Sequence, residues 1–272
     1  MKRTLVALAA VLAVAPALAG AAVTVKGSDT MVILAQRWAE EYMKKNPAKK
    51  VQVTGGGSGT GIAALINGTT DIADASRAMK DDEKAKVRDR YNVLPTETPV
   101  AKDGVAIYVN EANAVQQLTV DQLHAIYVGD VTNWKQVGGN DAPIALYSRE
   151  NSSGTYVFFK ENVLKGDDYA ASAQTLPGTA AVVNAIAKEK NGIGYGGAAY
   201  AKGVKELKVV GADGQPYAPT EQNVKSGKYP LSRPLFMYTR AKPAGEAKDF
   251  IDFCLSPEGQ AIVTKVGYFP IK

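Results

Sequence analysis

Short apolar stretches alternate with helical patterns along the first part of the chain. Val23–Lys26, Val51–Val53 and Ile72–Ala73 have the spacing of short strands. Between the first two, Met31–Lys45 predicts a helix, because apolar residues recur every four positions on one face until Asn-Pro ends the pattern. Strands that alternate with helices are typical of an α/β domain with a mostly parallel sheet.

Two later strands suggest that the chain leaves this domain and returns to it. Gly104–Val109 reads as a strand that crosses into a second domain, and Pro234–Tyr238 as a strand that crosses back. This organisation predicts two lobes with a cleft between them. The remaining expected strands are 144–147 and 192–196, and the expected helices are 62–66, 81–90, 118–127, 155–164, 180–187 and a pair within 247–266.

The first residues have the pattern of a secretory signal peptide. A basic start is followed by an apolar, Ala-rich run and by Ala17-Leu18-Ala19, a small-x-small cleavage signal. We expect cleavage after Ala19, with sites up to residue 22 as alternatives. No cysteine lies at this junction, so the sequence predicts a periplasmic protein without a lipid anchor.

Charge and cysteine content exclude several classes of protein. The net charge of +5 includes two residues of the signal peptide, and the lysines are scattered. We therefore expect neither nucleic-acid binding nor a polybasic membrane patch. The single cysteine, Cys254, has no partner for a disulfide and lies in an apolar helical pattern, which predicts a buried side chain.

Three loops combine Ser or Thr with Gly between an expected strand and an expected helix. They are 27–30 (GSDT), 57–60 (GSGT) and 152–155 (SSGT), and the second lies in TGGGSGTG, where five glycines occur within seven residues. Helix N-termini present unpaired N–H groups and a partial positive charge, and glycine allows close approach of the backbone. Each loop alone is compatible with a simple helix cap. Three together favour a shared anion site.

An arginine is needed to give such a site useful affinity. Helix ends contribute about 0.3–1 kcal/mol each, whereas micromolar binding requires about 8 kcal/mol. Charge-assisted hydrogen bonds of about 1.5–3 kcal/mol each can supply the difference. Arg149 in YSRENSSGTY is the candidate donor, with Glu150 and Asn151 as neighbours that could orient it; the alternative is a solvated surface arginine.

Other chemistries fit the sequence less well. The glycine-rich loop lacks the Gly-Lys-Ser/Thr of a Walker loop, has Thr60 in place of the third glycine of a dinucleotide fingerprint, and misses the nucleophile elbow around Ser58 by one residue. The only histidine, His124, lies in a helical stretch away from the serine loops. A Ser-His-Asp triad or a His/Cys zinc site therefore has little support, and we expect binding without a cofactor.

Six segments, in order across essentially the whole mature chain, carry a family resemblance. With them the chain resembles the periplasmic phosphate-binding proteins of ABC transporters, the phosphate-specific transport substrate-binding family. The segments are VKGSDTMVILAQRWAEEY, VTGGGSGTGIAALINGTTDIADASRAM, LTVDQLHAIYVGDVTNWKQVGG, YSRENSSGTYVFF, NGIGYGGAAYA and FIDFCLSPEGQAIVTKVGYFPI.

The resemblance implies a two-lobed, type II periplasmic-binding-protein fold that closes on one phosphate ion. Residues 23–101 and 231–272 would form lobe 1, and residues 102–230 lobe 2. The implied partners are inorganic phosphate and an inner-membrane ABC permease, and we expect a monomer. The residues implied in phosphate binding are Ser28, Asp29, Thr30, Ser58, Ser76, Arg77, Arg149, Ser153, Gly154 and Thr155.

One position departs from well-known members of this family. They have an aspartate where this chain has Arg77, and that carboxylate accepts the proton of HPO₄²⁻ and disfavours sulfate. A site made only of donors cannot make this distinction. Shorter members often have Ser-Arg here. Our hypothesis is that Asp74 or Asp29 supplies the acceptor, although Asp29 could also be a helix cap and Asp74 a turn residue.

Three alternative functions remain open at this point. The first is a receptor for another tetrahedral oxyanion, such as sulfate, molybdate or tungstate. The second is a secreted phosphatase with Ser58 or Ser153 as the nucleophile, which the missing histidine base and metal cluster disfavour. A sensor or adhesion module on the same fold is a third possibility.

Overall fold

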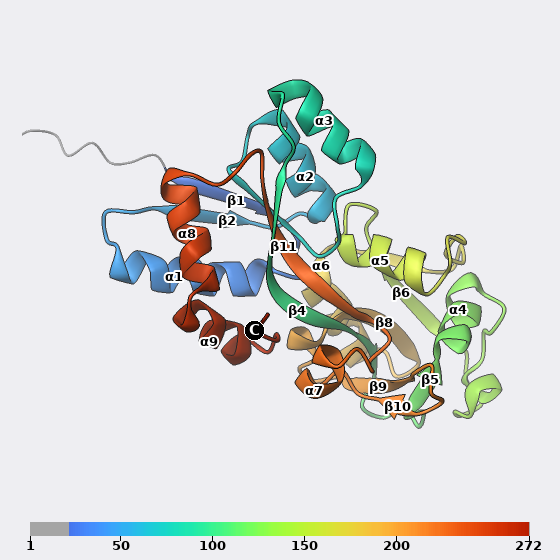
Figure 1. The fold of residues 1–272 in the computed structure, drawn as a ribbon. Coiled ribbons are helices and arrows are strands. Elements are labelled where there is room, and N and C mark those ends of the chain that lie inside the picture. Colours follow the sequence, from blue (N-terminus) through green and yellow to red (C-terminus); the bar gives the residue numbers. More distant parts are fainter. Residues whose placement is uncertain (1–21, 272) are drawn as a thin grey trace, which may run out of the picture.

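A computed structural model describes residues 22–271, so the predicted signal peptide lies outside the described residues. The strands form a hydrogen-bonded path in the order β2-β1-β3-β11-β4-β8-β6-β7, and β9 joins β4, β5 and β10. Figure 1 shows that this path runs through two lobes, with β4 and β11 passing between them. No helix in the described range has the length and apolar character needed to span a membrane.

The first lobe combines the N-terminal α/β units with the C-terminal helix pair. Strand β1 pairs in parallel with both β2 and β3. Apolar side chains of α1, α8 and α9 pack on one face of this sheet, and those of α2 and α3 on the other. Its elements are β1 (Val23–Gly27), α1 (Val32–Lys45), β2 (Val51–Thr54), α2 (Ser58–Asn67), β3 (Ile72–Ala75), α3 (Asp81–Tyr91), α8 (Gly245–Leu255) and α9 (Pro257–Val266).

The second lobe has its own parallel strands and its own core. Strand β6 pairs in parallel with β7 and β8. Apolar side chains of α4 and α5, among them Phe159, pack together with Trp134 in one core. Its elements are β5 (Gln117–Thr119), α4 (Val120–Val128), η1 (Trp134–Val137), β6 (Ala145–Arg149), α5 (Gly154–Asn162), β7 (Gln174–Leu176), α6 (Gly178–Lys188), β8 (Gly192–Gly197), η2 (Ala198–Tyr200), β9 (Lys205–Val210), β10 (Pro216–Tyr217) and α7 (Glu221–Lys225).

Two strands connect the lobes, as the sequence predicts: β4 (Thr96–Val109) and β11 (Ser232–Thr239). The first part of β4 pairs with β11, and its last residues, from Val105 onward, pair with β8. Both pairings are antiparallel, and so are those of β9 with β4 and β10. The expectation of a mostly parallel sheet therefore holds for β1 to β3 and for β6 to β8, and is wrong for the connecting strands and for β9 with β10. The predicted lobe boundaries at 101/102 and 230/231 fall within β4 and just before β11, and they stay a prediction.

Local contacts explain where the observed elements differ from the expected ones. Helix α4 begins at Val120 because the Thr119 hydroxyl accepts a hydrogen bond from the Gln122 N–H, which leaves Leu118 to pair with β9. Helix α2 begins at Ser58 and therefore includes two glycines that the pattern places in a loop. Cys254 is fully buried, as predicted.

Candidate functional site

The three serine-containing loops meet where the two lobes touch. The Thr30 and Thr155 hydroxyl oxygens, from different lobes, are 2.9 Å apart. The Gly59 N–H donates to the Ser152 carbonyl across the same gap at 2.8 Å, and the Ser58 and Ser76 hydroxyl oxygens lie 3.4 Å apart. Ser28, directly after β1, is buried, and its N–H donates to the Asp74 carbonyl at 2.9 Å. The structure thus brings together residues separated by more than 100 positions in the chain.

The glycines in these loops allow the opposing backbones to approach. A Cβ atom on Gly57 would lie 2.5 Å from the Ser152 carbonyl oxygen, and the φ of this glycine is +92°. In the other lobe, a Cβ atom on Gly154 would lie 2.3 Å from the Ser58 hydroxyl oxygen and 2.7 Å from that of Ser76. Glycine is required at these two positions because the opposing lobe occupies the space that a side chain would need.

Helix N-termini and hydroxyl groups contribute donors at this contact. Ser153 is the N-cap of α5, and its hydroxyl accepts from the Thr155 and Tyr156 N–H groups. The cap interpretation is therefore correct for the Ser153 side chain. Helices α1 and α2 begin without a side-chain cap, and the Ser58 hydroxyl instead accepts from the Ser76 N–H at 3.0 Å. These three helix ends place partial positive charge at the interlobe contact.

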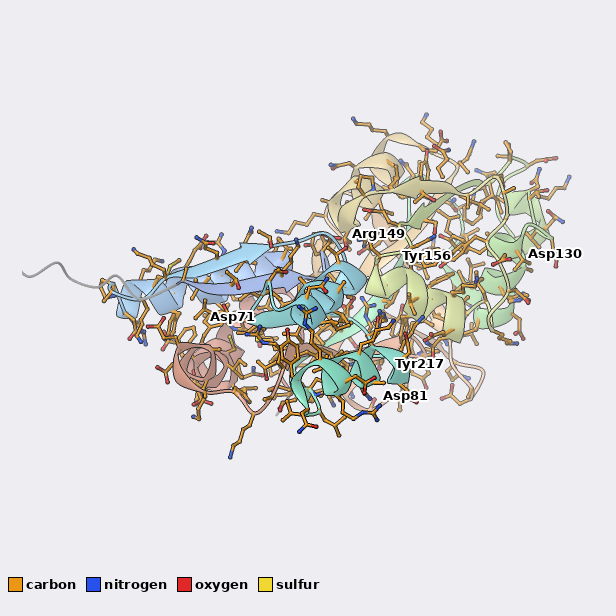
Figure 2. All side chains as sticks on the ribbon, turned by 90° about the horizontal axis from the view of Figure 1, so that it is seen from above. Asp71, Asp81, Asp130, Arg149, Tyr156 and Tyr217 are labelled. Carbon is orange, nitrogen blue, oxygen red and sulfur yellow. The ribbon has the colours of Figure 1, made fainter. Side chains whose placement is uncertain are left out.

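Arg149 is one of the buried arginines of this region. Its side chain is only 1% exposed and donates to the Thr179 hydroxyl at 2.8 Å and to Asp29 Oδ2 at 3.1 Å. The orienting carboxylate is thus Asp29 of the opposite lobe, whose Oδ1 accepts from the Gly56 N–H at 2.8 Å. Burial lowers the pKa of the Arg149 guanidinium, and Asp29 opposes that shift. Figure 2 shows Arg149 near the middle of the molecule.

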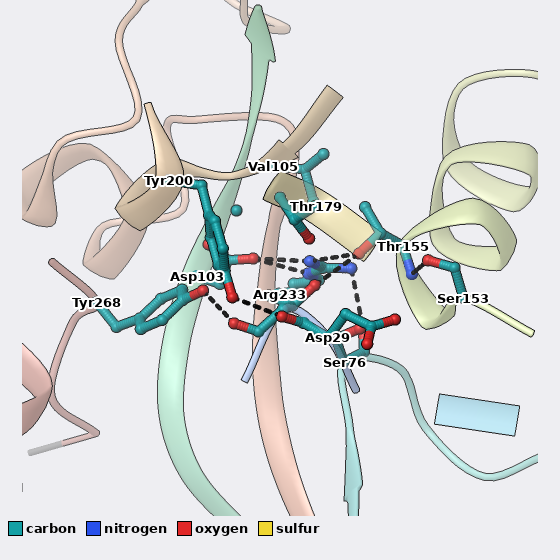
Figure 3. Close-up of polar contacts among 12 residues, drawn as sticks. Asp29, Ser76, Asp103, Val105, Ser153, Thr155, Thr179, Tyr200, Arg233 and Tyr268 are labelled. Atoms are coloured by element: carbon teal, nitrogen blue, oxygen red, sulfur yellow. Dashed lines mark hydrogen bonds and ion pairs between the residues drawn. The ribbon is translucent and has the colours of Figure 1, made fainter. Parts of the chain in front are cut away.

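A second buried arginine, Arg233, lies at the same place but is not among the residues predicted from the sequence. Figure 3 shows its contacts with Asp103, Thr155 and Ser76. Its Nε and Nη2 atoms donate to Asp103 Oδ2 at 3.0 and 2.8 Å, Nη2 also donates to the Thr155 hydroxyl at 3.0 Å, and Nη1 donates to the Ser76 carbonyl at 3.0 Å. A charged residue at the start of an otherwise apolar strand is the only sequence signal for it.

Two predicted residues are not joined to this cluster by their side chains. The Arg77 Nη atoms donate to both carboxylate oxygens of Glu83 at 2.7 Å and to the Ala78 carbonyl, so the guanidinium is held by α3. Asp74 is buried, its Oδ1 has no hydrogen-bond partner in the part of the chain that the structure describes, and burial raises its pKa well above the usual value. A carboxyl group in such surroundings is protonated more readily, which makes it a donor.

No metal site accompanies the cluster in residues 22–271: no group of three or more His, Cys, Asp or Glu side chains in that range could hold an ion. His124 lies on α4 and contacts Asp167 at 3.0 Å, not one of the serine hydroxyls. The arrangement therefore offers hydroxyl, amide and guanidinium donors, gathered between two lobes, to an oxyanion.

The fold and this donor set define the class of protein, a two-lobed binding protein. The family model of the PBP superfamily domain matches residues 13–258. The chain is similar to the phosphate-binding protein PstS of Pseudomonas aeruginosa, with 37% identity over 264 residues, 90% of this chain and 81% of the relative. A PstS protein of Staphylococcus epidermidis is also 37% identical, over 87% of this chain and 75% of its own length.

Solved structures of phosphate-binding proteins are also similar to this chain. A phosphate ABC transporter substrate-binding protein from Clostridium perfringens with bound phosphate has a TM-score of 0.85 and 34% identity, with 93% of this chain and 100% of that chain covered. An ABC-type phosphate transport receptor from Vibrio cholerae has a TM-score of 0.73 and 33% identity, over 91% of this chain and 99% of the other. The chain belongs to the PstS family of phosphate-binding proteins, and the predicted two-lobed fold is confirmed.

Proposed function

We propose that this protein captures inorganic phosphate and delivers it to an ABC permease. The observation that carries the proposal is the set of donors from both lobes, which surrounds the contact of Thr30 with Thr155 and includes the buried Arg149. Relatives and structural neighbours with the names given above support the same ligand. An ion that contacts both lobes would stabilise the closed arrangement over an open one, and the permease would recognise the closed form.

The proposed role is that of a receptor and not of an enzyme. Ser58 accepts from a backbone N–H and Ser153 caps a helix, and His124 pairs with Asp167 instead of activating either serine. We further propose that the chain is exported, cleaved after Ala19 and monomeric, without a lipid anchor. N-terminal sequencing and sedimentation of the exported protein check these points.

Asp29 is our proposal for the group that accepts the phosphate proton. Its carboxylate lies at the interlobe contact, where it shares Arg149 with the proposed anion, and the Asp29 backbone carbonyl accepts from the Tyr200 hydroxyl at 2.6 Å. A carboxylate beside a bound anion is tolerated only when a proton lies between the two. Sulfate has no such proton, so this position would favour phosphate. Within residues 22–271, no hydrogen bond joins the Asp74 side chain to the other residues of the site.

Calorimetric titration of the mature protein tests the function. The protein is first unfolded and refolded to remove ligand carried through purification, and is then titrated at neutral pH with phosphate and with sulfate. We expect tight binding of phosphate and much weaker binding of sulfate. Equal binding of both ions would indicate a general oxyanion receptor, and no heat with either would contradict the proposal.

Asp29→Asn is expected to lower the preference for phosphate over sulfate. Asparagine keeps an oxygen for the Gly56 N–H but is a poorer acceptor for the phosphate proton, so the ratio of the two dissociation constants should fall by roughly 10- to 100-fold, the equivalent of one charge-assisted hydrogen bond. The matched variant is Asp74→Asn, which should leave the ratio unchanged. A lower ratio for Asp74→Asn alone would transfer the acceptor role to that residue.

A further inference from the structure

We propose that Arg233 is a positioning residue of the phosphate site, which fixes the direction of the Thr155 hydroxyl from the strands that connect the lobes. This inference rests on the proposed phosphate function. Arg233 lies on β11 directly opposite Asp103 on β4, and both side chains are buried. Because β4 and β11 carry the chain between the lobes, the pair lies at the junction of the two bodies.

Arg233 contacts both lobes at once. Its Nη2 atom donates to the hydroxyl of Thr155, at the start of α5 in the second lobe. Its Nη1 atom donates to the carbonyl of Ser76, which follows β3 in the first lobe. These contacts and the two bonds to Asp103 use four of the five N–H donors of the guanidinium. Figure 3 shows this side chain between Asp103 and Thr155.

The contact with Thr155 determines what that hydroxyl can do. A guanidinium has no acceptor, so the Thr155 oxygen must be the acceptor in their 3.0 Å hydrogen bond. The hydroxyl proton of Thr155 is then directed elsewhere, either to the Thr30 oxygen at 2.9 Å or to a bound ion. An oxyanion needs donors, and a hydroxyl can either donate or accept. The hydrogen bond from Arg233 thus leaves the Thr155 hydroxyl to act as a donor toward a bound ion.

Because Asp103 pairs with Arg233, the effect of Arg233 on the site comes from the hydrogen bond that it makes and not from its charge. Asp103 neutralises Arg233 through a 2.8 Å ion pair between two side chains that are almost fully buried. The pair therefore adds no net charge to the site, and its effect on an anion should pass through Thr155. Removal of Arg233 alone would leave a buried, unpaired carboxylate, which is strongly destabilising. The variants below take this into account.

A double-mutant cycle on the dissociation constant for phosphate tests the role. The cycle compares the wild type, Arg233→Met, Thr155→Val and the double variant by calorimetry. We expect each single variant to weaken binding by roughly 10- to 100-fold, and the double variant to be no weaker than the worse single variant by more than about 3-fold. Arg240→Met removes a partly exposed arginine directly after the same strand; it is the control and should bind phosphate like the wild type.

The remaining outcomes separate a positioning role from a structural one. If the affinity loss of the double variant equals the product of the two single losses, Arg233 does not act through Thr155, and the inference is overturned. If Arg233→Met does not fold, the cycle is repeated with Arg233→Met combined with Asp103→Asn, which removes both charges. A wild type that binds no phosphate would contradict the proposed function itself, whereas a binding wild type with multiplying losses contradicts only the role of Arg233.

Discussion

Arg149→Ala is expected to reduce phosphate affinity by ~10²- to 10⁴-fold, the largest loss among single substitutions in this protein. Two charge-assisted hydrogen bonds of about 1.5–3 kcal/mol each account for this range. The alanine would also leave Asp29 without its guanidinium partner at the interlobe contact, which places an uncompensated carboxylate beside the anion. Calorimetric titration with phosphate measures the effect, and urea unfolding of the same variant reports any loss of stability.

Two comparisons make this result specific. Arg149→Lys keeps the charge but cannot reproduce the planar fork that reaches Thr179 and Asp29 together, so we expect it to recover only part of the affinity. Arg37→Ala removes an exposed arginine that pairs with Glu40 on α1, and it should bind phosphate normally. A normal dissociation constant for Arg149→Ala would remove Arg149 from the site.

Gly154→Ala is expected to weaken phosphate binding by roughly 10- to 100-fold, because overpacking costs about 1–3 kcal/mol. The added methyl group would lie 2.3 Å from the Ser58 hydroxyl oxygen, which belongs to the other lobe, so the clash exists only when the lobes are together. Alanine suits the first turn of a helix. The free energy of unfolding in urea should therefore change little while the dissociation constant rises.

Gly59→Ala is the matched control for this substitution. It also adds a methyl group at the interlobe contact, but its nearest neighbour, the Ser152 carbonyl oxygen, would be 3.3 Å away. We expect a clearly smaller loss of affinity than for Gly154→Ala. Equal affinities of Gly154→Ala and the wild type would show that phosphate binding does not require the lobes to approach as closely as they do in this structure.

Local patterns were sufficient to predict most of the fold and the loops of the site. The strand-loop-helix units around Ser28, Ser58 and Ser153 have short-range signatures, and the connecting strands were visible as apolar runs. Strand β9 was not predicted, because its buried Leu207 and Val209 alternate with the charged Glu206 and Lys208, so that the segment resembles an exposed, charged stretch. Glycines in the first turn of α2 also concealed the start of that helix.

The partners of the charged groups could not be predicted in the same way. Asp29 and Arg149 are 120 positions apart, and Arg233 and Asp103 are 130 apart. Nothing local in the sequence connects such residues, because their pairing depends on how β4 and β11 join the lobes. Arg77 shows the opposite case: its partner, Glu83, is only six residues away in the first turn of α3, so the sequence places the two side chains near each other.

Arg149, Arg233 and Arg77 each have a carboxylate partner within the protein. Arg149 is paired with Asp29, Arg233 with Asp103, and Arg77 with Glu83. An ion farther away than one Debye length, about 8 Å at physiological ionic strength, therefore experiences little net attraction from these three guanidinium groups. These three ion pairs therefore contribute little to long-range electrostatic steering. The protein would recognise its ligand at contact, through the direction of hydrogen bonds, and common monovalent anions would gain little from entering.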